Sequence, residues 1–345
     1  MQREFVRSSM ENLRVAVVGA GIMGADHIAR INQRISGAEV SAVIEVDKNR
    51  ADAALKLAPG SLHFANIEDA IQAGVADAVL IATPGPFHEP VLLPAISAKL
   101  PTLCEKPLTP DSASSLRVVA AEVEAGEQLI QVGFMRRFDS QYQQLKLAIS
   151  SGELGELLAL RCQHRNPSVP DGYHNDMLIF DSVVHEIDVV RFLTESPILS
   201  VEVKHLRRNP NSPANLEEPI LVLLETEAGV VADVEMNVSG RFGYQVKTEA
   251  VFQNGIVEIG RTSGLTLWQN GRYGGEEHVT YTTRFAQAYD EQVQRWVDAA
   301  RNRSIDGPNA WDGYLAAAAV EAGVRALHSG LKESVSYSAK PNLYA

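Results

Sequence analysis

Cysteine is scarce in this sequence of 345 residues, which contains only Cys104 and Cys162. Two cysteines are too few for the disulfide framework of a small secreted domain, and no spacing of Cys and His resembles a zinc site. Both are expected as reduced thiols, and Cys104 as a buried strand residue rather than a nucleophile. We therefore expect a cytoplasmic protein without a metal site.

Positive charge is also in short supply. The chain has 31 Lys and Arg against 43 Asp and Glu, a formal net charge of −12. Phosphate backbones are bound by basic surfaces, so a nucleic-acid partner is not expected. An acidic surface is compatible with a small neutral ligand.

Long apolar runs are missing as well. Val15–Ala25 is too short and too rich in glycine to span a bilayer, so no membrane association is expected. Met1–Asn12 is polar and lacks the apolar core of a signal peptide. We expect these residues to form an N-terminal extension, with Met10 as an alternative start.

The chain is long enough for two domains, and its first third alternates strand-like and helix-like segments. This alternation predicts a doubly wound parallel sheet, a Rossmann-type α/β domain over residues 13–133. The strands are expected at Leu13–Val18, Glu39–Val46, Ala78–Ala82, Thr102–Glu105 and Leu129–Phe134, and the helices include Ile22–Ser36, Phe87–Ala98 and Ser112–Ala125.

The alternation ends after Phe134, and several strands then follow one another with short turns. This pattern predicts an α+β domain with an open, mostly antiparallel sheet over residues 134–345. The strands are expected at Leu157–His164, Ile198–Leu206, Ile220–Glu227, Val230–Val238, Val246–Phe252 and Gly255–Ile259, and the helices near Ser140–Ser150, Asp176–Leu193, Phe285–Asn302 and Ala310–Ser329.

A glycine-rich turn joins the first predicted strand to the first helix. Its sequence Gly-Ala-Gly-Ile-Met-Gly fits G-x-G-x-x-G in the context that makes this motif informative. The glycines allow a tight turn, a close approach of the backbone to a pyrophosphate, and close packing of helix on strand. We expect dinucleotide binding by Gly19, Gly21, Ile22, Met23 and Gly24.

An acidic residue ends the second predicted strand. Glu45 lies 21 residues after Gly24, where a carboxylate accepts hydrogen bonds from the adenosine ribose and repels the extra phosphate of NADP. NAD is therefore the favoured cofactor. Asp47 is the alternative acid, and the nearby Lys48 and Arg50 leave NADP open.

Two further loops follow strands of the same predicted sheet, one beginning at Thr83 and one at Glu105. Parallel sheets bind ligands outside the carboxyl ends of their strands, so both loops should face the nicotinamide end of the cofactor. Lys106 could stabilise a developing alkoxide there, and Pro107 could hold it through a cis bond. From position alone, a surface lysine is an equal alternative.

Asp181, His185 and Asp188 share one face of an otherwise apolar predicted helix. His185 is a natural general base, because the unperturbed pKa of histidine is near neutrality. Asp181 could orient its ring or contact a substrate. The alternative is a buried polar face satisfied by internal hydrogen bonds. A metalloprotease site is rejected, because H-E-x-x-H would need histidine at Val189.

The three motifs together resemble the Gfo/Idh/MocA family of NAD(P)-dependent oxidoreductases. Four longer blocks are similar to the inositol dehydrogenases within that family: Gly133–Asp139, His164–Pro167, His185–Asp188 and Trp311–Tyr314. The resemblance runs from about Leu13 to the C-terminus. The first dozen residues have no counterpart in it, and Glu45 stands where close relatives usually carry aspartate.

The resemblance implies a Rossmann domain followed by a domain whose open sheet supports a homotetramer. It implies Lys106, Asp181 and His185 as catalytic residues, with His88 and Glu105 on the cofactor side. It also implies substrate contacts from Arg136, His164, Asn166 and Tyr244, besides Asp181 and His185.

The implied activity is oxidation of myo-inositol to its 2-keto product with NAD. Scyllo-inositol, another cyclitol or a pyranose sugar is an alternative substrate. A catalytically silent NAD-binding sensor is the alternative of a different class.

Overall fold

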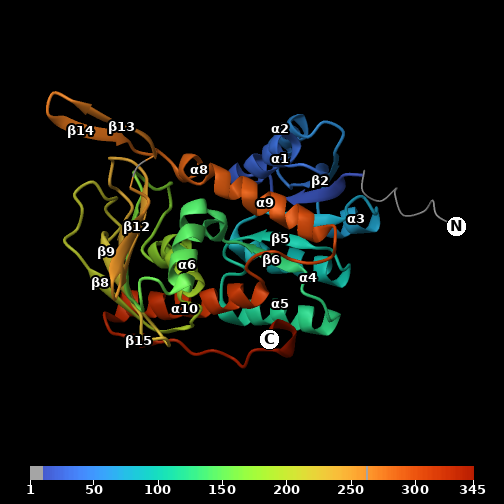
Figure 1. Ribbon diagram of the computed structural model, residues 1–345. Coiled ribbons are helices and arrows are strands. Elements are labelled where there is room, and N and C mark those ends of the chain that lie inside the picture. Colours follow the sequence, from blue (N-terminus) through green and yellow to red (C-terminus); the bar gives the residue numbers. More distant parts are fainter. Residues whose placement is uncertain (1–10, 262) are drawn as a thin grey trace. The chain divides into compact units, whose positions relative to one another are not determined.

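The computed structural model describes residues 11–261 and 263–345, which form two compact units (Figure 1). The first unit comprises the chain as far as Phe134, with Asp290–Tyr314 and Ala339–Ala345. The second comprises Met135–Tyr289 and Leu315–Ser338. Of the expected N-terminal extension, residues 1–10, including Met10, lie outside the described residues.

The first unit contains the predicted parallel sheet, with six strands in the order β3-β2-β1-β4-β5-β6. The order reverses between β1 and β4, which creates the crevice where such sheets bind ligands. The strands are β1 Leu13–Val18, β2 Ala38–Ile44, β3 Leu62–Phe64, β4 Ala78–Ile81, β5 Thr102–Glu105 and β6 Ile130–Gly133. The prediction of a doubly wound α/β domain is confirmed, although β3 was not expected.

Five helices connect these strands: α1 Ile22–Arg34, α2 Lys48–Leu57, α3 Ile67–Gln72, α4 Glu89–Ser97 and α5 Ser112–Ala125. Asp47 and Asp111 cap α2 and α5 by accepting hydrogen bonds from the main chain of the first turn. Asp47, the alternative ribose ligand, is thus a helix cap. The predicted helix at Phe87 begins two residues later, after a 3-10 turn at Gly85–Phe87.

The second unit does not contain the whole chain after residue 134. Helix α9, Ala286–Ala300, places Val293, Trp296 and Val297 in the hydrophobic core of the first unit. Their apolar surface is buried against β1 and α1 residues such as Val15 and Ile28, which explains why this late segment belongs to the early domain.

The second unit contains a seven-stranded sheet in the order β12-β11-β7-β10-β9-β8-β15. Only β10 and β7 pair in parallel, so the sheet is mostly antiparallel, as predicted. Burial alternates along β9 and β11, because one sheet face packs on the core. The strands are β7 Leu157–Arg165, β8 Ile198–His205, β9 Ile220–Thr226, β10 Val231–Asn237, β11 Gln245–Phe252, β12 Gly255–Ile259 and β15 Glu333–Ser334.

A separate hairpin, β13 Ser263–Gln269 and β14 Arg272–Glu276, was not expected from the sequence (Figure 1, upper left). The remaining helices are α6 Ser140–Ser151, α7 Val184–Thr194, α8 Tyr281–Arg284 and α10 Ala310–Ser329. None of the helices in the described parts of the chain has the length and apolarity needed to cross a bilayer.

The helix predicted over Asp176–Leu193 is not a continuous α-helix. A π-helical turn over Leu178–Val183 precedes α7. Such turns use i→i+5 hydrogen bonds and are frequent at functional sites. Asp181 lies within this turn and His185 lies just after it, so their relative orientation is not that of an ideal α-helix.

Candidate functional site

The glycine-rich loop occupies the crevice edge of the first unit, between β1 and α1. Gly19 has a φ of +88°, and a Cβ on it would lie 2.8 Å from Thr83 Cγ2. A Cβ on Gly24 would lie 1.9 Å from the carbonyl oxygen of Gly19. Both positions therefore require glycine to keep the turn tight and α1 close to the sheet.

Space is open where a dinucleotide diphosphate would bind. Apart from its chain neighbours, no atom of the described residues lies within 4 Å of the Cβ position of Gly21, and α1 begins there without a side-chain cap or an acidic residue in its first turn. At the start of α1, Ile22 is exposed and Met23 is half-buried, and main-chain N–H groups of a first helical turn can bind an anion. Thr83 Oγ1 is buried and has no hydrogen-bond partner in the described part of the chain, so a polar ligand atom can satisfy it. These features fit NAD.

Glu45 directly follows β2 and is tied to the glycine-rich loop. Its Oε2 accepts a hydrogen bond from Ala20 N at 2.9 Å, and its Oε1 accepts from Asp47 N at 2.9 Å and Arg50 Nη2 at 3.1 Å. Burial alone would raise the pKa of Glu45, but these hydrogen bonds hold the pKa below its ordinary value. The carboxylate is charged beside the loop, while Arg50 partly offsets that charge.

The loop after β5 carries Lys106, and the Lys106–Pro107 peptide bond is cis, which confirms that prediction. Lys106 is half-buried. Its main-chain N–H donates to Glu105 Oε2 at 3.3 Å, and Glu105 Oε1 lies 2.7 Å from Nε2 of the fully buried His27. Glu105, expected on the cofactor side, is thus bound to α1 through His27.

His88 is fully buried at the start of α4. Its Nδ1 lies 2.8 Å from Pro107 O, its Nε2 lies 2.7 Å from Thr83 O, and Cys104 Sγ lies 3.3 Å from Nδ1. Burial lowers the pKa of His88 despite the raising effect of the main-chain carbonyls, and burial also raises the pKa of Cys104. This placement favours support of the loop over the expected cofactor contact, and Cys104 is the buried strand thiol predicted.

In the second unit, several predicted residues gather around one histidine. His164 lies on β7, and its ring centroid is 6.4 Å from that of His185 and 5.9 Å from that of Tyr244, which it meets edge to face. His185 is 9% exposed, and Asp181 is half-buried. Burial raises the pKa of Tyr244 to about 12, so its hydroxyl keeps its proton at neutral pH.

Arg136, Glu186 and His164 form what we call the buried charge cluster. Arg136 pairs with Glu186 through Nη1, and His164 Nδ1 lies 3.2 Å from Arg136 Nη2 and 3.1 Å from Glu186 Oε2. Burial opposes ionisation of Glu186, but Arg136 and His164 lower its pKa to about 2. Arg136 is only 1% exposed, which does not support the substrate contact expected of it.

Glu186 was not predicted as a site residue, although it belongs to the rejected zinc motif and to the His185–Asp188 block. The available signal was a carboxylate within an apolar helix, since a buried charge requires a partner. Asp188, expected on the same face as His185, pairs instead with Arg137 at 2.6 Å.

Asn166 follows β7 and carries an unsatisfied polar atom. Its main chain bonds to Asn237 O and Gly240 N, but its buried Oδ1 has no partner among the described residues. A ligand hydroxyl could donate to this oxygen. No group of three or more metal-ligating His, Cys, Asp or Glu side chains occurs over residues 11–261 and 263–345.

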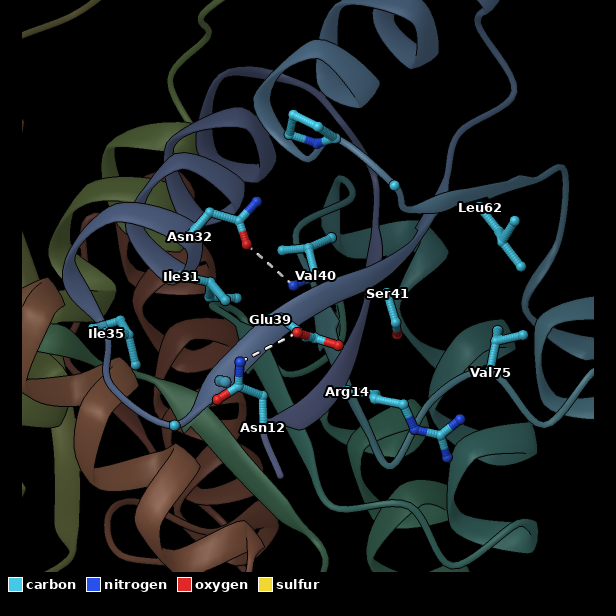
Figure 2. A pocket seen from close by; sticks show the side chains of 14 residues that line it. Asn12, Arg14, Ile31, Asn32, Ile35, Glu39, Val40, Ser41, Leu62 and Val75 are labelled. Atoms are coloured by element: carbon cyan, nitrogen blue, oxygen red, sulfur yellow. Dashed lines mark hydrogen bonds between the residues drawn. The ribbon is translucent and has the colours of Figure 1, made fainter. Parts of the chain in front are cut away.

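A hollow at the opposite, amino edge of the first sheet contains none of these residues (Figure 2). Asn12 donates to Glu39 Oε2 there at 3.2 Å, and Asn32 Oδ1 accepts from Val40 N at 3.2 Å. Polar groups in this hollow thus bond to one another, and ligands of parallel sheets bind at the carboxyl edge instead.

The predicted residues therefore fall into two sets. Lys106 and the cofactor residues belong to the first unit, and the other substrate and catalytic residues belong to the second.

Comparisons with known proteins match both parts of the chain. Residues 13–134 match the Gfo/Idh/MocA oxidoreductase family with its NAD-binding Rossmann fold, and residues 142–258 match the C-terminal domain of that family. Inositol 2-dehydrogenase of Leifsonia xyli subsp. xyli is 58% identical over 97% of this chain and 98% of its own. The corresponding protein of Corynebacterium glutamicum is 57% identical over 97% and 99%.

A solved structure is also similar. Myo-inositol dehydrogenase from Lactobacillus casei, in complex with NAD(H) and myo-inositol, is 31% identical, with a TM-score of 0.93 over 97% of this chain and 100% of its own. The folds, the glycine-rich loop and the full-length relatives lead to one conclusion: the chain is an NAD-binding oxidoreductase of the Gfo/Idh/MocA family.

Proposed function

We propose that the protein oxidises myo-inositol to 2-keto-myo-inositol (scyllo-inosose) with NAD. The observation that carries this proposal is the 58% identity, over nearly both full lengths, to a protein named inositol 2-dehydrogenase. The polar side chains around His185 add support, because a cyclitol offers only hydroxyl groups for recognition.

We propose that Lys106 of the first unit and Asp181 and His185 of the second serve one reaction. His185 removes the proton of the reacting hydroxyl, Lys106 stabilises the developing alkoxide, and Asp181 orients the histidine. NAD held at the glycine-rich loop would supply the hydride acceptor for the carbon that carries the reacting hydroxyl. His164, Asn166 and Tyr244 hold the remaining hydroxyls.

The decisive experiment incubates purified protein with NAD and separate cyclitols or sugars while absorbance of reduced cofactor is followed. Highest kcat/KM with myo-inositol supports the proposal. If kcat/KM is highest with scyllo-inositol, another cyclitol or a pyranose, that compound takes the place of myo-inositol as the proposed substrate. No turnover with any polyol favours an NAD-binding sensor. Scyllo-inositol belongs in the panel because scyllo-inositol dehydrogenase from Lactobacillus casei has a TM-score of 0.85 at 25% identity.

The preference for NAD over NADP is proposed from Glu45. Its charged carboxylate lies beside the glycine-rich loop, where it would repel a 2′-phosphate. The same assay with NADP tests this, and a higher kcat/KM with NADP would contradict it.

A homotetramer is proposed as the assembly. The hairpin β13–β14 exposes Leu267, Trp268 and Tyr273, and such apolar side chains are often covered by a partner. Sedimentation equilibrium tests this, and a monomer at micromolar concentration would contradict it.

A further inference from the structure

We propose that His88 is a positioning residue, which fixes the Lys106–Pro107 loop by tying it to the end of β4. The inference rests on the role proposed above for Lys106. It assigns His88 a function distinct from contact with cofactor or substrate.

The ring of His88 bridges two loops at the carboxyl edge of the sheet. Nδ1 lies 2.8 Å from Pro107 O and 3.2 Å from Leu108 O, in the loop after β5. Nε2 lies 2.7 Å from Thr83 O, in the loop after β4. Each nitrogen therefore faces a carbonyl oxygen. The neutral ring carries one N–H and donates to the carbonyl on that side, and the other nitrogen packs against the opposite loop.

The main chain of His88 is itself held in place. Its N–H donates to Gly85 O at 3.1 Å, and its carbonyl accepts from Leu92 N at 2.8 Å in the first turn of α4. A Cβ on Gly85 would lie only 3.3 Å from Pro107 Cγ, so the two loops also approach closely at this glycine. The imidazole is thus a rigid link rather than a mobile side chain.

Lys106 lies between two such attachments. On its N-terminal side, Glu105 accepts from Lys106 N and lies 2.7 Å from His27 Nε2. On its C-terminal side, Pro107 O faces His88. Since an error of about 1 Å in a catalytic group can lower the rate about 10²-fold, loss of the His88 link should affect turnover through Lys106.

Two substitutions separate hydrogen bonding from packing. His88→Leu fills similar space without a donor, whereas His88→Gln keeps an amide donor. We expect kcat to fall about 10–100-fold in His88→Leu and less in His88→Gln, with the Kd of NAD nearly unchanged. His205→Leu is the control, because His205 bonds a main-chain carbonyl, Leu327 O, within the second unit.

The outcomes are distinct. The positioning role is overturned if His88→Leu keeps the wild-type kcat, or if kcat falls equally in His88→Leu and His88→Gln. It is also overturned if the variants lose NAD affinity while kcat is retained. If His88→Leu does not fold, His88→Gln decides alone: reduced kcat with retained NAD affinity is expected, and wild-type kcat refutes the proposal.

Hydrogen–deuterium exchange separates this inference from the proposed reaction. Amides of residues 83–88 and 105–109 should exchange faster in the His88 variants than in the wild type, while β1 and α1 remain protected. That result would support the loop link even if the wild type did not oxidise myo-inositol. Unchanged exchange in both segments would overturn it.

Discussion

The carboxyl edge of the first sheet and the buried charge cluster of the second unit are built in different ways. At the sheet edge, glycines and main-chain groups make the surface, and a Cβ on Gly24 would overlap the main chain of Gly19. In the buried charge cluster, Arg136 from the segment after β6 and Glu186 from α7 neutralise each other, and His164 from β7 lies against both. Backbone geometry creates the first region, and charge pairing creates the second.

This difference determines what each region tolerates. A backbone site depends on the absence of side chains and on the direction of N–H groups. A buried ion pair depends on both partners, because one partner alone leaves an uncompensated charge. The two regions should therefore fail differently when altered, one in binding and the other in stability.

The largest effect is expected for His185, which borders the buried charge cluster without being part of it. His185→Ala should lower kcat by about 10²–10⁴-fold, because a positioned general base contributes about that much. The Kd of NAD, set in the first unit, should not change. Steady-state kinetics and a fluorescence titration with NAD measure the two quantities.

His328→Ala is the matched control, since His328 pairs with Asp176 and its side chain is 61% exposed. Its kcat should equal that of the wild type. A near-normal kcat in His185→Ala would remove the general base from the proposal.

A second test concerns stability. Glu186→Gln should lower the free energy of unfolding by about 3–5 kcal/mol, because Arg136 would lose its buried counter-charge. Glu235→Gln should cost less than about 1 kcal/mol, since Glu235 pairs with the partly exposed Arg165. Urea unfolding measures both, and equal losses would contradict the contrast between buried and exposed pairs.

The contribution of Glu186 to the free energy of unfolding should also depend on pH. Its pKa is lowered from 4.5 to about 2 in the folded protein, so its carboxylate stabilises the fold above pH 4.5. That contribution is lost as the pH falls from 4.5 towards about 2. The stability difference between wild type and Glu186→Gln should shrink over this interval, and a constant difference would refute the assignment.

The smallest effect is expected at the glycine-rich loop. Gly24→Ala should force α1 away from the loop at a cost of about 1–3 kcal/mol, and weaken NAD binding accordingly. Calorimetric titration with NAD measures this. Gly274→Ala is the control, because no atom lies within 4 Å of the Cβ position there. Equal NAD affinity in both variants would show that the loop tolerates a side chain.

The first unit was largely predictable from the sequence, because its signals are local. The strand at Leu13–Val18, the glycine-rich turn and the following helix are adjacent in the chain, and their spacing determines their geometry. The acid that directly follows β2 and the cis bond after Lys106 were predicted by the same local reasoning.

The features that the sequence did not predict depend on contacts between residues that are distant in the chain. Glu186 meets Arg136 across 50 positions, and no local pattern pairs them. Trp296 belongs to the first core although strands β7 to β12 of the second sheet precede it in the chain. The apolar pattern of residues 176–193 correctly indicates a helix, but periodicity alone did not separate the π turn from the α-helix that follows.

Because of the π turn at Leu178–Val183, the orientation of Asp181 relative to His185 depends on the number of residues in this turn. It is therefore sensitive to insertion and deletion rather than to substitution. In an α-helix each residue advances the direction of a side chain by about 100°. Loss of one residue from this turn could restore ordinary helical bonding, yet it would rotate the segment carrying Asp181 by about that angle relative to His185. A homologue one residue shorter here could keep both side chains and their apolar neighbours and still lose their shared orientation.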